Sequence, residues 1–186
     1  MKRVFDLSMS VLLAGLLICP MVIIALLIRI TSPGPVLHWS ERVGRLNKNF
    51  LMPKFRTMKM ETPAVATDLL DNPDQWLTPI GPFLRKLSLD ELPQLWSICM
   101  GEMSIVGPRP ALFNQRELIA LRTSKGIHEL VPGLTGWAQV NRRDAVTTAQ
   151  KVALDEEYLF RRSFCFDLKI IWMTMFKVIS SEGISH

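Results

Sequence analysis

Residues 7–28 read LSMSVLLAGLLICPMVIIALLI, an apolar run that contains a proline at position 20. A straight helix of this length would extend roughly 33 Å, enough to cross a hydrocarbon core of about 30 Å. A proline inside a helix has no N–H for the carbonyl four residues back, so we expect a kink or break at Cys19 and Pro20. Neither half of the run is then long enough to cross a membrane alone.

Basic residues lie on both sides of this run. Lys2 and Arg3 precede it, and the basic residues that follow are Arg29, Arg42, Arg45, Lys48, Lys54 and Arg56. Because basic residues favour the cytoplasmic side of a membrane, both ends are expected there. A re-entrant segment that turns at the proline satisfies both signals, whereas one kinked span satisfies the length alone. A cleavable signal peptide fits less well, since the apolar region is long and an aspartate precedes it.

Composition limits the remaining possibilities. The chain has 186 residues, with 22 basic and 17 acidic side chains and a net charge of +5. Without residues 1–30, the remaining residues 31–186 form one domain that is long enough for a hydrophobic core. The positive net charge favours anionic partners. Cys19, Cys99 and Cys165 show no paired spacing, which argues against a disulfide framework or a cysteine metal site and fits a reducing compartment.

The segment SLDELPQLWSICMG, residues 88–101, predicts a helix from about 89 to 100. Ser88 and Glu91 match a capping box, and Gly101 suits the position after a helix. Pro93 predicts distortion of the first turns. Asp90 falls in the first turn, where the helix N-terminus favours a negative charge, so it suits a nucleophile or a metal ligand. The alternative is that Glu91 only caps the helix.

Several basic residues are candidates for phosphate binding. Lys54 and Arg56 end a basic stretch over residues 41–59, for which a solvated, lipid-facing patch is the alternative. Arg109 lies between two prolines, and its planar guanidinium suits bidentate phosphate contacts. The loop 132–144 combines glycines with an aromatic residue, Arg142 and Arg143, so it could bind a base, a sugar or a phosphate. The alternative is a surface loop that precedes a helix. Residues 158–179 interleave large apolar and basic side chains, which predicts interfacial helices or, alternatively, burial against the core.

These stretches together resemble a known family, the bacterial sugar transferases, which are monotopic polyprenyl-phosphate phosphoglycosyl transferases. The resemblance runs in order over nearly the whole chain, through SPGP (32–35), KFRTM (54–58), SLDELPQL (88–95), VGPRP (106–110) and residues 132–141. It implies a mostly helical α+β fold with a re-entrant N-terminal helix broken at proline, a small cytoplasmic catalytic domain and interfacial amphipathic helices. The chain is similar to the small members, which consist of the catalytic core.

The resemblance also implies a reaction. The family transfers a sugar-1-phosphate from a UDP-sugar to undecaprenyl phosphate with Mg²⁺ and releases UMP, at the cytoplasmic face of the bacterial inner membrane. This step initiates assembly of O-antigen, capsule, exopolysaccharide or glycoprotein glycans, with later glycosyltransferases of the pathway as possible partners. The other expected partners are the two substrates and the lipid bilayer. A nucleic acid partner is not expected.

By the same resemblance, Asp90 forms a covalent phospho-sugar intermediate, and Glu91 supports the second half-reaction or the metal. Both carboxylates are therefore candidate Mg²⁺ ligands. The implied phosphate contacts are Lys54, Arg109 and Arg143, and Asp155 and Asp167 are further candidates for the site.

The chain departs from the family pattern in three places. Cys19-Pro20 stands where Ser-Pro is usual, and a thiol is a weaker hydrogen-bond partner than a hydroxyl. Asn47 and Arg142 occupy positions where glycine is frequent. Two other functions stay open from the residues alone: a membrane-tethered basic scaffold or nucleic-acid binder, with salt-sensitive binding and no turnover, and a single-span subunit of a larger complex. Neither explains the Asp90-Glu91 pair.

Overall fold

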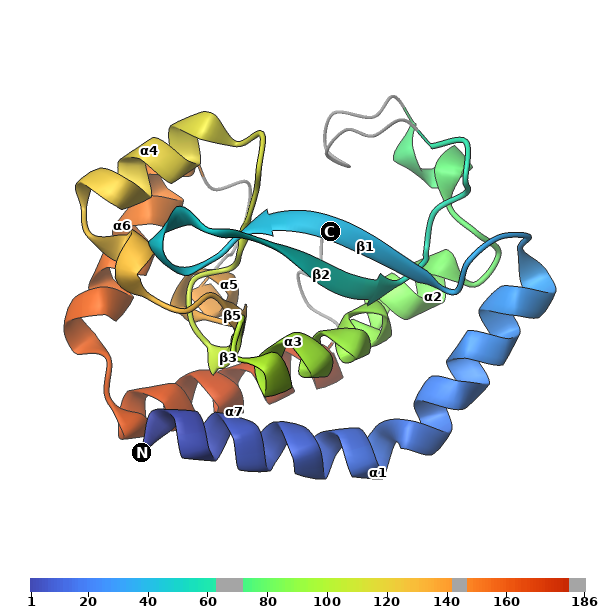
Figure 1. Ribbon diagram of the computed structural model, residues 1–186, viewed down its shortest axis with the longest axis horizontal. Helices are drawn as coiled ribbons and strands as arrows, with labels where there is room; N and C mark the ends of the chain where they lie inside the picture. Colours follow the sequence, from blue (N-terminus) through green and yellow to red (C-terminus); the bar gives the residue numbers. More distant parts are fainter. Residues whose placement is uncertain (63–71, 142–146, 181–186) are drawn as a thin grey trace.

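The computed structural model describes residues 1–62, 72–141 and 147–180, and it confirms a mostly helical α+β fold (Figure 1). The helices are α1 (Lys2–Thr31), α2 (Gly81–Lys86), α3 (Leu95–Met100), α4 (Arg116–Ser124), α5 (Trp137–Asn141), α6 (Thr148–Arg161) and α7 (Phe164–Ser180). The strands are β1 (Leu37–Val43), β2 (Asn49–Phe55), β3 (Ser104–Val106), β4 (Ala111–Leu112) and β5 (Gly133–Thr135). Short 3-10 helices are η1 (Arg45–Asn47), η3 (Pro73–Trp76), η4 (Leu89–Gln94) and η5 (Ile127–Glu129).

Helix α1 carries the apolar run, and it continues through Pro20. The ribbon bends in its middle but does not reverse direction, so the predicted disruption takes the form of a bend inside one helix (Figure 1). Only 11% of its most apolar 18-residue window is buried. By length and composition the helix can cross a membrane, and its uncovered apolar surface indicates membrane association. The fold is compatible with a monotopic membrane protein.

The first turns of α1 are fastened to the domain by polar contacts. Asp6 is buried, and its carboxylate accepts hydrogen bonds from the Ser104 hydroxyl at 2.8 Å and the Ile105 N–H at 3.2 Å. The neighbouring contacts are Lys2 with Asp167 at 2.6 Å, and Arg3 with the carbonyls of Ile98 and Cys99. Since a buried carboxylate is costly unless it is hydrogen-bonded, these donors determine where α1 begins on the domain.

The last turns of α1 pack on another part of the same domain. Ile24 and Ile28 are buried in an apolar cluster with Phe55 of β2 and Leu84 of α2. Beyond them the chain turns at residues 32–35 toward β1. Both ends of the long apolar helix therefore contact one domain, and the side chains between them include many that are exposed.

A three-stranded sheet with the order β2-β1-β4 lies across the domain. Strands β1 and β2 form an antiparallel hairpin with the register from Leu37 opposite Phe55 to Val43 opposite Asn49. Strand β2 was not predicted, because the basic residues of the stretch 41–59, in which it lies, indicated a solvated patch. Asn47 has a φ of 57° at the hairpin turn. Asparagine tolerates this left-handed conformation better than most residues, which explains how the turn forms without glycine at position 47.

The second sheet pairs β3 with β5 in parallel and brings two glycine-containing segments into close contact. A Cβ atom at Gly136 would lie 2.1 Å from the Gly107 carbonyl oxygen, and one at Gly107 would lie 2.4 Å from the Val131 carbonyl oxygen. Side chains of any size would separate these backbones. The contact sets the position of the Gly107–Pro110 turn, which follows β3 directly.

Helix α7 has buried apolar side chains on one part of its surface and exposed apolar side chains on another. Phe166 and Ile170 are buried in the core, together with Tyr158 of α6. The exposed apolar side chains of α7 are Phe164, Leu168, Trp172, Met175 and Phe176. Its placement at a membrane interface stays a prediction.

The close packing at Gly136 makes a prediction about stability. We expect Gly136→Ala to lower the free energy of unfolding by at least about 2 kcal/mol, because the methyl group would clash with the backbone of Gly107. Gly15→Ala is the control, because nothing lies within 4 Å of a Cβ atom at that position. Thermal unfolding of the detergent-purified proteins measures both effects. Equal melting temperatures for the two variants would contradict the packing of β3 against β5.

Candidate active site

The Asp90-Glu91 pair lies on η4, the 3-10 turn that precedes α3. The helix predicted from 89 to 100 is confirmed with a tightened start: the Glu91 N–H donates to the Ser88 carbonyl at 3.2 Å, an i to i−3 bond. Pro93 has no N–H to donate, which favours this departure from α-helix. Gly101 ends α3 with a φ of 88°, as predicted.

The predicted capping box is wrong. Ser88 has a φ of 54°, a left-handed conformation that costs a residue with a side chain about 1 kcal/mol, and its side chain makes no capping bond within the described residues. Glu91 is turned away from the helix N-terminus. The sharp turn at Ser88 places the end of α2 beside the Asp90-Glu91 pair.

Glu91 is the centre of the polar cluster. One of its oxygens, Oε1, accepts from Lys54 Nζ at 2.8 Å and from Arg109 Nη2 at 2.6 Å. Burial alone would raise the pKa of Glu91, but Arg109 and Lys54 outweigh it and hold this pKa well below its usual range. Glu91 is therefore an ionised counter-charge that joins β2 to the turn after β3.

Asp90 has a different environment from its neighbour. Its Oδ2 lies 4.0 Å from Lys54 Nζ, and its buried Oδ1 has no hydrogen-bond partner in the part of the chain that the structure describes. Burial raises the pKa of Asp90, while Lys54 opposes the shift. An unpaired buried oxygen costs about 1–3 kcal/mol, so Oδ1 is available to a ligand that would satisfy it. A carboxylate with a raised pKa is also the more basic and reactive nucleophile of the two.

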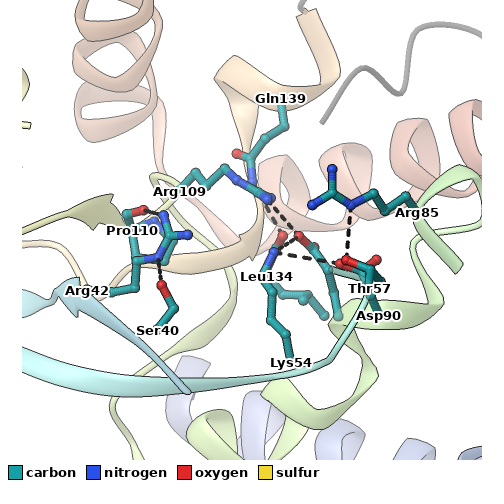
Figure 2. A network of polar contacts seen from close by, with 11 residues as sticks. Ser40, Arg42, Lys54, Thr57, Arg85, Asp90, Arg109, Pro110, Leu134 and Gln139 are labelled. Atoms are coloured by element: carbon teal, nitrogen blue, oxygen red, sulfur yellow. Dashed lines mark hydrogen bonds and ion pairs between the residues drawn. The ribbon is translucent and has the colours of Figure 1, made fainter. Parts of the chain in front are cut away.

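Two further arginines lie near the Asp90-Glu91 pair, Arg85 on the side of Asp90 and Arg42 at the Arg109–Pro110 turn, and sequence reasoning assigned neither to the site. Arg85 of α2 donates from Nε to the Thr57 hydroxyl at 3.1 Å, and its charge lowers the pKa of Asp90 against the effect of burial. Arg42 of β1 donates to the Ser40 hydroxyl and the Pro110 carbonyl (Figure 2). Ser40 and Arg42 alternate on one face of β1. Recognising the whole strand in the sequence would therefore have placed Arg42 on the same face as Ser40.

The backbone of Arg109 is fixed by a buried ion pair between Arg122 and Asp155. Arg122 of α4 donates to the Arg109 carbonyl at 2.9 Å and makes two bonds to Asp155 Oδ2, at 2.5 and 3.0 Å. Asp155, a predicted phosphate-site residue, therefore acts on the described site through Arg122. It is not among the side chains gathered around Asp90.

The other predicted residues lie as follows. Arg56 is buried, and its guanidinium donates to the carbonyls of Pro33 at 2.6 Å and Ser32 at 2.9 Å, which fixes the turn after α1. Asp167 accepts from Lys2 and from the Tyr158 hydroxyl at 2.7 Å, at the other end of α1. Arg143 lies outside the described residues.

A magnesium ion was expected at Asp90 and Glu91. Among the described residues no group of three or more His, Cys, Asp or Glu side chains gathers. Magnesium in phosphoryl-transfer sites is commonly held by one or two carboxylates together with substrate phosphates. The unpartnered Asp90 Oδ1 fits this minimal protein contribution, whereas Glu91 Oε1 is already occupied by two cations.

Comparison with known proteins gives consistent results. The family model described as "Bacterial sugar transferase" matches residues 1–181. The chain is 41% identical to the uncharacterized sugar transferase EpsL of Bacillus subtilis, with 100% of this chain and 91% of that protein covered. It is also 41% identical to the UDP-glucose:undecaprenyl-phosphate glucose-1-phosphate transferase of Escherichia coli, over 95% of this chain and 40% of that protein. A third relative, the undecaprenyl-phosphate glucose phosphotransferase of Komagataeibacter xylinus, is 40% identical over 98% of this chain and 36% of its own length. The chain therefore spans less than half of these last two relatives.

The buried pair behind Arg109 makes a prediction. Asp155→Asn would leave the Arg122 guanidinium buried without a counter-charge, and we expect it to lower the free energy of unfolding by about 3 kcal/mol. Glu156→Gln on the same helix is the control, since its ion pair with Lys125 is exposed and worth at most about 1 kcal/mol. Denaturant unfolding measures both variants. A loss at Asp155 no larger than that at Glu156 would refute a supporting role for the pair.

Proposed function

The chain belongs to the bacterial sugar transferase family, and from this membership and the geometry around Asp90 we propose that it transfers a sugar-1-phosphate from a UDP-sugar to undecaprenyl phosphate. The observation that carries the proposal is the buried Oδ1 of Asp90, which has no hydrogen-bond partner among the described residues and lies beside Lys54, Arg85 and Arg109. A nucleophile among cations suits attack on an anionic phosphate, because the cations offset the charge of both reactants. A basic scaffold would not need a carboxylate kept in this state.

In the first half-reaction an Asp90 carboxylate oxygen attacks the phosphorus that bears the sugar. An O–P bond forms, the bond from that phosphorus to the bridging oxygen breaks, and UMP leaves with the bonding pair of electrons. Lys54 and Arg109 bind the non-bridging oxygens, and Glu91 holds both cations in place. Because Glu91 is ionised before substrate arrives, this arrangement needs no reorganisation during the reaction.

In the second half-reaction a phosphate oxygen of undecaprenyl phosphate attacks the same phosphorus. The bond to Asp90 breaks, the carboxylate is regenerated, and the sugar leaves on an undecaprenyl diphosphate. Of the two expected ligands, Asp90 would hold Mg²⁺ together with the substrate phosphates, because Glu91 Oε1 already binds Lys54 and Arg109. When bound, the ion supplies charge neutralisation for the phosphates. The product would enter assembly of a bacterial surface polysaccharide or glycoprotein glycan.

The same membership supports a position at the cytoplasmic face of the inner membrane, with α1 re-entering the face from which it came. Two features of α1 favour this topology over a single span: Asp6 at its start and Ile28 near its end are both buried against one domain. A helix that crossed the bilayer would separate these contacts. The bend in its middle is compatible with a segment that stays in one leaflet.

The covalent mechanism is tested with Asp90→Asn. We expect a loss of turnover of at least about 1,000-fold in the release of UMP, since an amide does not form the acyl phosphate. Wild-type protein incubated with radiolabelled UDP-sugar in the absence of undecaprenyl phosphate should retain label after denaturation, and the variant should not. A screen of UDP-sugars for released UMP identifies the donor. Near-normal turnover by Asp90→Asn would refute the aspartyl intermediate.

The topology is tested by labelling single cysteines at positions 2 and 31 of a variant that lacks Cys19, Cys99 and Cys165. We expect a membrane-impermeant thiol reagent to reach both positions from the same side of sealed vesicles, because both ends of α1 contact one domain. A cysteine in place of the exposed Lys125 is the control, because it reports on which side of the vesicle membrane the domain lies. Labelling of positions 2 and 31 from opposite sides would establish a span.

A further inference from the structure

Arg42 is a charged residue beside the active site whose role the proposed reaction does not explain. In the hairpin, His38, Ser40 and Arg42 alternate along β1, and His38 is directly opposite Lys54 on β2. Residues at alternate positions and in direct cross-strand pairs share one face of a sheet. Arg42 and Lys54 therefore belong to the same face of the hairpin, the face that approaches η4 and the Gly107–Pro110 turn.

The contacts of Arg42 orient its guanidinium without neutralising it. Nε donates to the Ser40 hydroxyl at 3.0 Å, and one terminal nitrogen donates to the Pro110 carbonyl at 3.4 Å. Both acceptors are uncharged, and within the described ranges no carboxylate lies within ion-pair distance of Arg42. Figure 2 shows Arg42 next to the Arg109–Pro110 turn, on the side opposite Asp90.

The charge balance of the cluster is uneven. Among the described residues, Lys54, Arg85, Arg109 and Arg42 lie near Asp90 and Glu91, and Asp74 adds a negative charge on the Arg85 side. The bound oxygen of Glu91 is already shared by Lys54 and Arg109. Burial and the nearby Arg109 lower the pKa of Arg42 to about 10, with Glu91 only partly opposing them. A partly buried guanidinium beside a like charge is unfavourable unless an anion joins it. The surplus positive charge thus lies at the Arg42 end of the cluster.

We propose that Arg42, together with Arg109, binds the phosphate that leaves with the nucleoside, on the side of the cluster away from Asp90. The inference rests on the proposed function, since it divides the two phosphates of the donor between two parts of the site. Lys54 and Arg109 bind the phosphate that Asp90 attacks. Arg42 presents a planar fork of donors to the departing phosphate, whose charge increases as the bridging P–O bond breaks.

The division distinguishes the two half-reactions. The nucleotide phosphate is present only in the first, while the phosphate of the lipid acceptor takes part in the second. Loss of the Arg42 guanidinium should therefore weaken binding of the nucleotide and leave use of the lipid acceptor unchanged. A residue that only held the Arg109 turn in position would affect both half-reactions equally, because Arg109 serves both.

The test uses UMP as a probe that requires no turnover. We expect Arg42→Gln to weaken UMP binding by about tenfold or more, measured by titration calorimetry on full-length protein in nanodiscs, because a charge-assisted hydrogen bond is lost. Arg42→Lys, which keeps the charge but not the fork, should lie between this variant and wild type. Arg45→Gln is the matched control, since Arg45 is exposed, donates to the Glu129 carbonyl and lies beyond the cluster, so UMP binding should stay within about twofold.

Kinetics complete the test. In this two-step reaction kcat/KM for each substrate reports its own half-reaction. In Arg42→Gln, kcat/KM for undecaprenyl phosphate should be unchanged, while kcat/KM for the UDP-sugar falls and the inhibition constant of UMP rises, each by at least the factor measured for binding. Unchanged UMP affinity would overturn the proposal, and so would equal losses for both substrates, which would reduce Arg42 to a support for the turn. If Arg42→Gln does not fold, as judged by its melting temperature, Arg42→Lys decides by the same comparison. Wild-type protein that neither binds UMP nor turns over would instead refute the proposed function.

Discussion

The site depends on the contacts that Lys54 and Arg109 both make with one oxygen of Glu91. Lys54 comes from β2, Arg109 from the turn after β3, and Glu91 from η4, so one carboxylate oxygen joins three segments that are far apart in the sequence. Each partner is in turn fixed by a separate part of the fold. The hairpin register places Lys54, the glycine contact between β3 and β5 places the turn, and Arg122 holds the carbonyl of Arg109. Because Glu91 is buried and its two cations are only partly exposed, removing either cation would leave the carboxylate with less of the charge that offsets its burial.

Helix α1 is part of this domain and is more than its membrane attachment. Asp6 accepts bonds from β3, the strand that leads into the Arg109 turn, while Ile28 packs with Phe55 at the end of the strand that carries Lys54. The two ends of the apolar helix therefore contact the two elements that supply the active-site cations. The exposed apolar surface of α1 and the surface that supports the candidate site therefore belong to the same helix.

The sequence was informative where the signal is local. The helix over residues 89–100, the distortion of its first turns at Pro93 and its termination at Gly101 were predicted from local residues, and the structure has all three. The capping box failed because Lys54 and Arg109, both distant in sequence, bind Glu91 more strongly than its own helix terminus does. Arg42 and Arg85 were missed for the same reason: their roles depend on strand pairing and on the left-handed turn at Ser88, which no local pattern encodes. Asp155 was assigned to the site without its partner, since a sequence does not show that Arg122 lies between it and Arg109.

Two adjacent carboxylates with opposite pKa shifts separate their chemical roles. Glu91 has a pKa well below the usual range because two cations bind one oxygen, so it does not take up a proton near neutral pH and acts as a fixed charge. Asp90 has a raised pKa because burial outweighs Lys54, and its free oxygen has no competing donor within the described residues. Environments that push neighbouring pKa values apart assign different tasks to chemically similar groups. The structure thus favours Asp90 as the group that reacts and Glu91 as the group that keeps Lys54 and Arg109 in position, an assignment that follows from the contacts of each carboxylate and does not depend on which sugar is transferred.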